Sequence, residues 1–345
     1  MRPVFVPTLL NGPTGDPGLW VDVFDENRAL LFDLGDVHAL PARKLIRVER
    51  AFVTHTHLDH FIGFDRLLRL LLPRERPCTI TGPPGFLDRV EGKIAAYTWN
   101  LIGSYPVRIT AEEIDGDVVR AVRYTGAGGM RPEPLPDRRF DGAFHAERLF
   151  TAHAAVLDHG IPVLAFAIRE TERLAVDPDR LARDGLRPGP WLGELKQAVR
   201  RCLPDDAPIQ AACADDRTRT ATVAELATAY LRRARGRRLA YVTDLRYTED
   251  NVARVVELAR GVDLLVCEAT FLDEDAALAA DRGHLTARQC GEIARAAGAA
   301  RLLPFHISPR YKGRVRELFE EAAAAFGGPI STSIEGRGAV ATECP

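Results

Sequence analysis

The sequence of 345 residues contains few lysines and no long apolar run. Lysine occurs only at positions 44, 93, 196 and 312, so arginine carries the other positive charges. The formal net charge of −2 excludes a general basic field that collects nucleic acid, and such a substrate would need a local basic patch.

No apolar run approaches the roughly 18 residues of a membrane-spanning helix. The first ten residues, MRPVFVPTLL, lack the basic start and apolar stretch of a signal peptide, and we expect a cytoplasmic protein that does not enter a membrane.

Cysteine is also sparse and shows no paired spacing. The six cysteines lie at positions 78, 202, 213, 267, 290 and 344. This pattern excludes both a disulfide framework and a structural zinc site of the Cys-x-x-Cys kind. The hydrophobic content of 46% is enough for a sizeable core, and we expect a single domain over 1–345.

The sequence does contain a concentration of histidine directly after an apolar β-branched run. His55, His57, Asp59 and His60 fall within six residues of the segment AFVTHTHLDH. Alternation along an extended chain puts His55 and His57 on one side, and the following turn can bring Asp59 and His60 back toward them. A lone histidine near a strand end is usually an ordinary polar residue. Four such groups together suit zinc and similar metals, and they can hold two ions, as hydrolytic sites do.

The remaining sequence predicts two sets of strands covered by helices. We predict a loop over 125–138, and an insertion or protruding arm without a core of its own over 172–220. The expected architecture is a four-layer αββα sandwich of the α/β class. The predicted strands cover 3–8, 18–24, 28–33, 47–54, 78–81, 105–109, 117–124, 148–157, 161–168, 238–243, 263–267 and 301–305. The predicted helices cover 64–72, 86–97, 222–234, 249–260, 286–298 and 313–325.

Three further metal ligands are expected where predicted strands end. His159 is favoured over His153 because it lies at a turn marked by Gly160, where ligands can converge. Asp244 ends a strand and could bridge two cations, although an aspartate there could instead cap the next helix. His306 also ends a strand, and it completes the set in order along the chain.

Two residues between these candidates would serve proton transfer. Glu268 ends a strand, and His284 precedes a helix for which Thr286 is a candidate cap. Beside a metal site, a carboxylate and an imidazole that bind no metal could relay a proton to a leaving alkoxide. Taken alone, they would be a surface glutamate and a histidine in a cap loop.

Together these motifs resemble ribonuclease Z within the metallo-β-lactamase superfamily. The chain departs from the family pattern at Cys267, where the family usually has histidine, and at Leu245, where it has threonine. The matching segments are His-x-His-x-Asp-His at 55–60, Gly82-Pro83, His159, 188–196, 241–247, Glu-Ala-Thr-Phe at 268–271, Gly-His-x-Thr at 283–286, and the histidine before Ser-x-Arg-Tyr at 306–311.

The resemblance implies an endoribonuclease that acts on a tRNA precursor or other RNA, with 172–220 as a substrate-gripping segment. It also implies a homodimer and two divalent metal ions, zinc above all, with manganese and iron as alternatives. A water activated by the metals would attack the phosphorus, with Asp59 orienting or deprotonating it and with Glu268 and His284 assisting departure of the leaving oxygen. The implied ligand sets are His55, His57, His159 and Asp244 for one metal, and Asp59, His60, His306 and the shared Asp244 for the other.

Two alternatives remain open. A related enzyme could hydrolyse a small phosphodiester, a lactone or a thioester, although Glu268 and His284 favour the phosphodiester. A protein that binds metal without catalysis is the second alternative. The only dense basic run, Arg232 to Arg238, is expected to be the solvated end of a helix.

Overall fold

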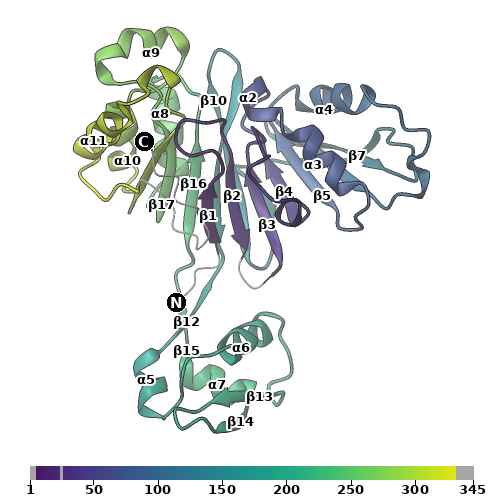
Figure 1. The fold of residues 1–345 in the computed structure, drawn as a ribbon, viewed down its shortest axis with the longest axis vertical. Coiled ribbons are helices and arrows are strands. Elements are labelled where there is room, and N and C mark those ends of the chain that lie inside the picture. Colours follow the sequence, from purple (N-terminus) through teal and green to yellow (C-terminus); the bar gives the residue numbers. More distant parts are fainter. Residues whose placement is uncertain (1–4, 24–25, 332–345) are drawn as a thin grey trace.

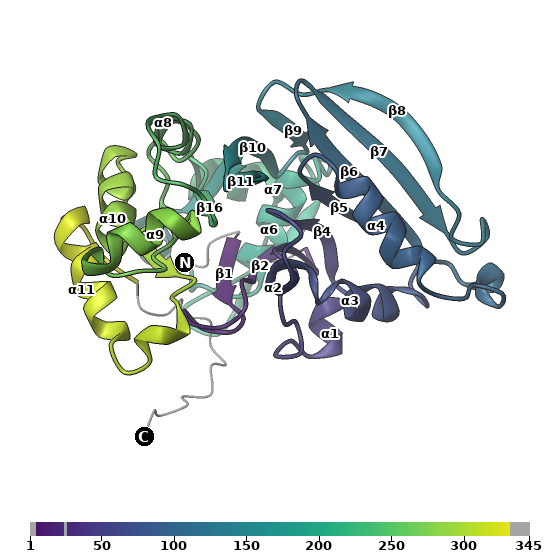
Figure 2. The ribbon, with the colours of Figure 1, turned by 90° about the horizontal axis from the view of Figure 1, so that it is seen from above.

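The computed structural model describes residues 5–23 and 26–331, which form two facing sheets with helices outside. Figure 1 shows strands of the first sheet side by side, and Figure 2 shows the helices on both outer sides. No helix among these residues is both long and apolar enough to cross a membrane. Positions 3, 4, 24 and 344, which belong to predictions above, lie outside the described residues.

The first sheet has eight strands in chain order. Its four central strands, β3 to β6, are parallel to one another, and the outer strands on both sides pair antiparallel. The strands are β1 (Phe5–Leu9), β2 (Leu19–Val23), β3 (Arg28–Phe32), β4 (Val48–Phe52), β5 (Cys78–Gly82), β6 (Arg108–Asp115), β7 (Val118–Thr125) and β8 (Glu133–Arg139).

The second sheet has six strands in the order β18-β17-β16-β11-β10-β9. Its strands β16, β17 and β18 are parallel, so their carboxyl ends meet at one edge. The strands are β9 (Ala143–Ala146), β10 (Phe150–Asp158), β11 (Pro162–Glu170), β16 (Arg238–Val242), β17 (Leu264–Glu268) and β18 (Leu302–Phe305).

Alternation along the strands divides the core into layers. In β3, Leu30 and Phe32 face the second sheet, whereas Leu31 packs in a separate cluster under the helices α3 and α4. In β16, Tyr241 faces the first sheet, and its ring centroid lies 5.5 Å from that of Phe32. This period of two places apolar side chains on both faces of each sheet, which is why both faces are covered.

Helices cover the outer faces, as the sequence predicts. On the first sheet lie α1 (Ala42–Leu45), α2 (Leu58–Phe61), α3 (Phe64–Leu71) and α4 (Phe86–Ala95). On the second sheet lie α8 (Glu249–Leu258), α9 (Ala276–Arg282), α10 (Ala287–Ala296) and α11 (Val315–Phe326). The four-layer prediction is therefore confirmed.

Residues 173–234, which we call the arm, project from one edge of the sandwich (Figure 1). Strands β12 (Arg173–Val176) and β15 (Leu231–Ala234) pair antiparallel as a stalk. The rest of the arm, which we call the head, consists of α5 (Pro178–Arg183), α6 (Trp191–Arg200), β13 (Pro208–Ala212), β14 (Thr218–Thr222) and α7 (Val223–Tyr230). Trp191, Leu195 and Leu226 are buried in a hydrophobic cluster of the head. This cluster contradicts the prediction that the segment has no core of its own.

Three element predictions are wrong in part. The helix predicted over 222–234 ends at Tyr230, because residues 231–234 pair with β12 and so extend the arm beyond the predicted limit at 220. The loop predicted over 125–138 contains most of β8, whose Pro134 and Pro136 are tolerated because β8 is the edge strand of its sheet. Strand β6 also runs to Asp115, well past the predicted end at 109.

Close backbone contacts at Gly35 join two loops and α2 beside the carboxyl end of β3. A Cβ atom at Gly35 would lie 2.5 Å from the carbonyl oxygen of Asp59 and 2.6 Å from that of Pro17. We expect Gly35→Ala to lower the free energy of unfolding by about 1–3 kcal/mol, because backbone atoms must shift. Gly92→Ala is the matched control: the α4 position is open, and alanine should stabilise the helix by about 0.5–1 kcal/mol. Urea unfolding of both variants measures this, and an unchanged Gly35→Ala protein would contradict it.

Candidate metal centre

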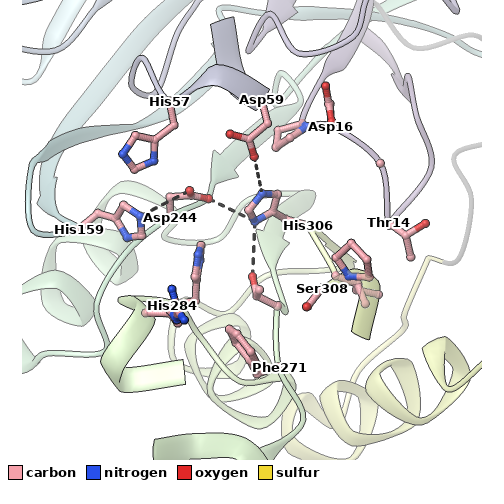
Figure 3. A pocket seen from close by; sticks show the side chains of 16 residues that line it. Thr14, Asp16, His57, Asp59, His159, Asp244, Phe271, His284, His306 and Ser308 are labelled. Carbon is pink, nitrogen blue, oxygen red and sulfur yellow. Dashed lines mark hydrogen bonds and ion pairs between the residues drawn. The ribbon is translucent and has the colours of Figure 1, made fainter. Parts of the chain in front are cut away.

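The candidate ligands meet where strands of both sheets end. His55 and His57 follow β4, and α2 carries Asp59 and His60. In the second sheet, His159 lies in the turn between β10 and β11, Asp244 follows β16, and His306 follows β18. Figure 3 shows His57 and His159 to one side of Asp244, and Asp59 and His306 to the other.

Backbone strain accompanies this convergence. Asp33, Asp244 and His306 each have a φ of 55°, in the left-handed region that residues other than glycine rarely adopt. Each residue directly follows, or lies within two residues of, the end of a strand. Such strain persists only where the surrounding structure enforces it, and it is concentrated at functional sites.

The first group of donor atoms is formed by His55, His57, His159 and Asp244. One donor atom from each of the four lies within 4.8 Å of the others. The Nε2 atoms of His55 and His159 lie 3.5 and 3.7 Å from Oδ2 of Asp244. His153, the disfavoured alternative to His159, lies elsewhere on β10 and hydrogen-bonds with Thr151.

The second group is formed by Asp59, His60 and His306, whose donor atoms also lie within 4.8 Å of one another. His306 Nε2 is 3.5 Å from Oδ2 of Asp59. His60 Nε2 is 3.4 Å from Oδ2 of Asp244, and His306 Nδ1 is 3.3 Å from the other oxygen, Oδ1. The carboxylate of Asp244 therefore lies between the two groups. It does not cap the next helix, because Thr248 caps α8.

The protonation of these groups suits a cation. Burial lowers the pKa of His55 to about 2, so its ring is neutral and can donate a lone pair. The hydrogen bond with His306 lowers the pKa of Asp59 to about 2 against the effect of burial. Burial by itself would raise the pKa of Asp244, but the imidazoles of His306 and His60 hold it well below its usual range. Neutral imidazoles and ionised carboxylates are the forms that bind metals.

Two buried nitrogen atoms complete this test of fit. Among the described residues, Nε2 of His55 and Nε2 of His60 have no hydrogen-bond partner, although both are fully buried. A buried polar atom without a partner costs about 1–3 kcal/mol, and a coordinated cation would remove that cost. The carboxylates of Asp244 and Asp33 raise the pKa of His60 even though its burial lowers it, so the surroundings favour positive charge at this ring. The residues therefore fit a divalent metal.

Sequence reasoning missed Asp33, which holds His60 in place. The Asp33 carboxylate is fully buried and accepts hydrogen bonds from the backbone N–H and hydroxyl of Thr54 and from the hydroxyl of Tyr241. His60 Nδ1 lies 3.0 Å from its Oδ2, which directs His60 Nε2 toward the donor group. The only signal was an aspartate directly after an apolar strand. His159 is oriented similarly, through Nδ1 and the carbonyl oxygen of Gly283 at 2.8 Å.

The buried Glu268 and the partly buried His284 form a pair beside the donor groups. Oε2 of Glu268 accepts from the Thr270 hydroxyl at 2.5 Å and lies 2.9 Å from His284 Nδ1, and Oε1 accepts the backbone N–H of Leu245 at 2.9 Å. Burial lowers the pKa of His284, but the charge and hydrogen bond of Glu268 outweigh this and raise it to about 9. Thr286 caps α10 with a capping box, as predicted. The carboxylate of Glu268 therefore favours the protonated form of His284 at neutral pH.

A cavity of about 500 Å³ opens above these groups. One wall is formed by Thr14 to Pro17 from the loop between β1 and β2, and an adjoining wall by Thr270, Phe271 and Ile307 to Pro309. The backbone N–H of Ile307 donates to the carbonyl oxygen of Pro13 and joins these walls. The cavity is large enough for a small group such as one nucleotide, and it is open to solvent above the donor groups.

The basic run predicted to end a helix lies instead along the stalk and the start of β16. Arg232, Arg233 and Arg235 pair with Asp177, Glu172 and Asp263 at 2.6, 3.0 and 3.2 Å. Much of this positive charge is therefore neutralised locally.

The chain is similar in sequence to known proteins. The family model described as "Beta-lactamase superfamily domain" matches residues 201–307. A ribonuclease Z of Deinococcus radiodurans is 32% identical over 338 residues, covering 92% of this chain and 95% of that protein. A ribonuclease Z of Geobacillus kaustophilus is 33% identical over 306 residues, covering 86% and 83%.

Solved structures share the fold at lower sequence identity. A metallo-β-lactamase fold protein of Bacillus subtilis superposes with a TM-score of 0.54 at 15% identity, covering 95% of both chains. The short form of human tRNase Z superposes with a TM-score of 0.51 at 19% identity, covering 89% of this chain and 93% of that one.

Replacement of Asp33 tests the support of His60. In Asp33→Asn, one carboxylate oxygen that accepts hydrogen bonds is replaced by an NH₂ group that cannot accept them. Asparagine can still adopt the left-handed backbone conformation of this residue. We expect the affinity for a divalent metal to fall by about 10- to 100-fold, as measured by competition with a chromogenic chelator. Asp36→Asn, in the neighbouring exposed loop, is the control. Unchanged affinity in Asp33→Asn would contradict this role.

Proposed function

This chain belongs to the ribonuclease Z family, and we propose that it is a two-metal endoribonuclease that cleaves tRNA precursors. The observation that carries the proposal is the complete set of donor residues with the Glu268–His284 pair beside it. Among the alternatives, a protein without catalysis has no use for a pair that keeps His284 protonated. Small substrates are disfavoured because the relatives that align over most of this chain are ribonucleases.

We assign the residues of one metal site as His55, His57, His159 and Asp244. The residues of the second are Asp59, His60 and His306, with Asp244 shared between the sites. Zinc is the metal most consistent with five imidazoles and two carboxylates, and manganese and iron accept the same ligands. When bound, the metals would lower the pKa of water and stabilise negative charge on the phosphate.

The protein residues would then control orientation and protons. The ionised carboxylate of Asp59 faces the cavity, where it can accept a hydrogen bond from the attacking water and fix its position. His284, held protonated by Glu268, would donate its Nε2 proton to the leaving oxygen. An alkoxide leaving group requires this proton, which is why the pair fits ribose-phosphate cleavage.

The position of the arm supports the further proposal of a homodimer. Strand β16 begins at Arg238 beside the stalk and ends just before Asp244, so the stalk and the metal centre lie at opposite ends of the strand. In Figure 1 the head and α2 lie at opposite ends of the molecule. The head of one protomer would therefore be better placed to hold RNA bound at the centre of its partner.

We also propose a cytoplasmic location. The five cysteines among the described residues are free thiols, as is typical of a reducing compartment.

Cleavage of a 3′-extended tRNA precursor, beside a panel of small phosphodiesters, tests the function. The purified protein should process the precursor, lose activity with a chelator, and regain it with two equivalents of zinc or manganese per chain. Turnover of small diesters with no cleavage of the precursor would overturn the RNA assignment. A protein that binds one equivalent or none when fully active would overturn the two-metal assignment.

The pH dependence of precursor cleavage should report the Glu268–His284 pair. His284 must hold its proton, and because Glu268 raises its pKa to about 9, activity should persist through neutral pH and fall as pH rises through about 9. In Glu268→Gln the supporting charge is lost, so kcat should already fall as pH rises through the ordinary histidine pKa of 6.5 or below. The exposed Glu257→Gln serves as the control. If kcat of Glu268→Gln fell over the same alkaline pH range as kcat of the parent, the proposed proton transfer from His284 would be contradicted.

Removal of the head tests whether it grips substrate. Joining Val176 to Leu231 through a short glycine turn removes 177–230 and keeps the paired strands of the stalk. We expect the KM for the precursor to rise at least about tenfold, equivalent to about 1.4 kcal/mol of binding, while hydrolysis of bis(p-nitrophenyl) phosphate stays within a factor of two. The head carries eight Arg and Lys against nine Asp and Glu, so local contacts would supply this affinity. An unchanged KM for the precursor would show that the head makes no such contact.

A further inference from the structure

Two arginines flank the metal centre without being ligands of it. Arg246 lies two residues after Asp244, and Arg282 lies two residues before His284. Their side chains are 49% and 69% exposed, so both guanidinium groups are open to solvent at the surface around the site.

Arg246 lies across the two loops that hold His159. Its Nη2 atom is 3.2 Å from where a Cβ atom at Gly160 would stand, and its Cγ atom is 3.5 Å from the equivalent position at Gly283. Its backbone N–H donates to the carbonyl oxygen of Asp158 at 2.9 Å. The backbone hydrogen bond therefore fixes the position of Arg246, and its side chain extends over the turn at Gly160 and over Gly283.

Arg282 is the last residue of α9 and lines the cavity together with His284 and Phe271. Among the described residues that line this cavity, it is the only arginine or lysine, beside three aspartates. Because Gly283 follows Arg282 and contacts Arg246, the two arginines lie on the same side of the centre, the side of the proposed proton donor His284.

Neither arginine has a strong partner among the described residues. Arg246 approaches Asp158 at 3.5 Å, and Arg282 approaches its neighbour Asp281 at 3.8 Å. Exposed pairs of this kind contribute at most about 1 kcal/mol. The stalk arginines, by contrast, pair at 2.6 to 3.2 Å. The guanidinium donors at the site therefore remain available to an anion, and their fork geometry matches phosphate oxygens.

We propose that Arg246 and Arg282 bind the RNA phosphate that adjoins the scissile one on the leaving-group side. This inference rests on the proposed function, and it adds a phosphate-binding subsite to the metal centre. The subsite orients the RNA so that the leaving oxygen faces His284. It explains how a chain with a net charge of −2 can engage a polyanion through local positive charge.

The test uses the full-length, metal-loaded protein and a cleavable RNA in two forms. One form is unmodified, and in the other the phosphate next to the cleavage site, on the leaving-group side, is a neutral methylphosphonate. Arg246→Gln and Arg282→Gln should each lower kcat/KM for the unmodified RNA at least tenfold. The slope of log kcat/KM against log salt concentration should become shallower by about 0.7 for each lost contact with a single strand. Arg316→Gln, an exposed arginine on α11, is the matched control and should match the parent.

The methylphosphonate separates contact from packing. If the arginines contact this phosphate, the parent should lose activity on the modified RNA, and the Gln variants should lose little more, because the same interaction is already absent. Arg246→Lys and Arg282→Lys, which keep the charge, should recover part of the loss and the salt slope. The subsite would be overturned if each Gln substitution lowered activity on the modified RNA by the same factor as on the unmodified RNA, and if the Lys variants were no better than the Gln variants. The proposed function would stand in that case. A parent that does not cleave RNA at all would overturn both.

Discussion

One buried carboxylate connects both sheets with the metal centre. Asp33 follows β3 of the first sheet, and it accepts hydrogen bonds from Thr54 after β4 and from Tyr241 of the second sheet. It also fixes the ring of His60. Because a buried charge without partners would be very costly, these contacts must form together when the sandwich closes. The packing of the two sheets and the orientation of a proposed metal ligand thus depend on the same four groups.

The centre is distributed so that neither sheet could form it alone. The first sheet supplies His55, His57, Asp59 and His60 from one short segment, whereas the second supplies one residue from each of three strand ends. The parallel order of β16, β17 and β18 puts Asp244, Glu268 and His306 at one edge, as expected where chain direction repeats. The two carboxylates therefore differ in position: the exposed carboxylate of Asp59 faces the cavity, whereas the buried carboxylate of Asp244 lies between the two donor groups.

Much of this could be predicted from the sequence, because the chemistry lies in short motifs at strand ends. The clustering of His55 to His60 requires only local geometry, and the choice of His159 over His153 required only the turn at Gly160. The role of Asp33 depends on a contact across 208 positions with Tyr241, for which a single sequence contains no signal. The end of α7 at Tyr230 was missed for a similar reason, since residues 231–234 become a strand only by pairing with β12. The roles of individual site residues in catalysis stay predictions.

The stalk has a consequence for how the chain unfolds. Two short strands are the covalent and hydrogen-bonded link between the sandwich and a head with a separate hydrophobic cluster. Few apolar contacts therefore couple the two cores, and cooperativity between them should be low. The head is expected to open and close as its own cooperative unit, with amide hydrogen-exchange rates distinct from those of the sandwich. Thermal denaturation would then contain two transitions, and a single melting temperature would not describe the protein.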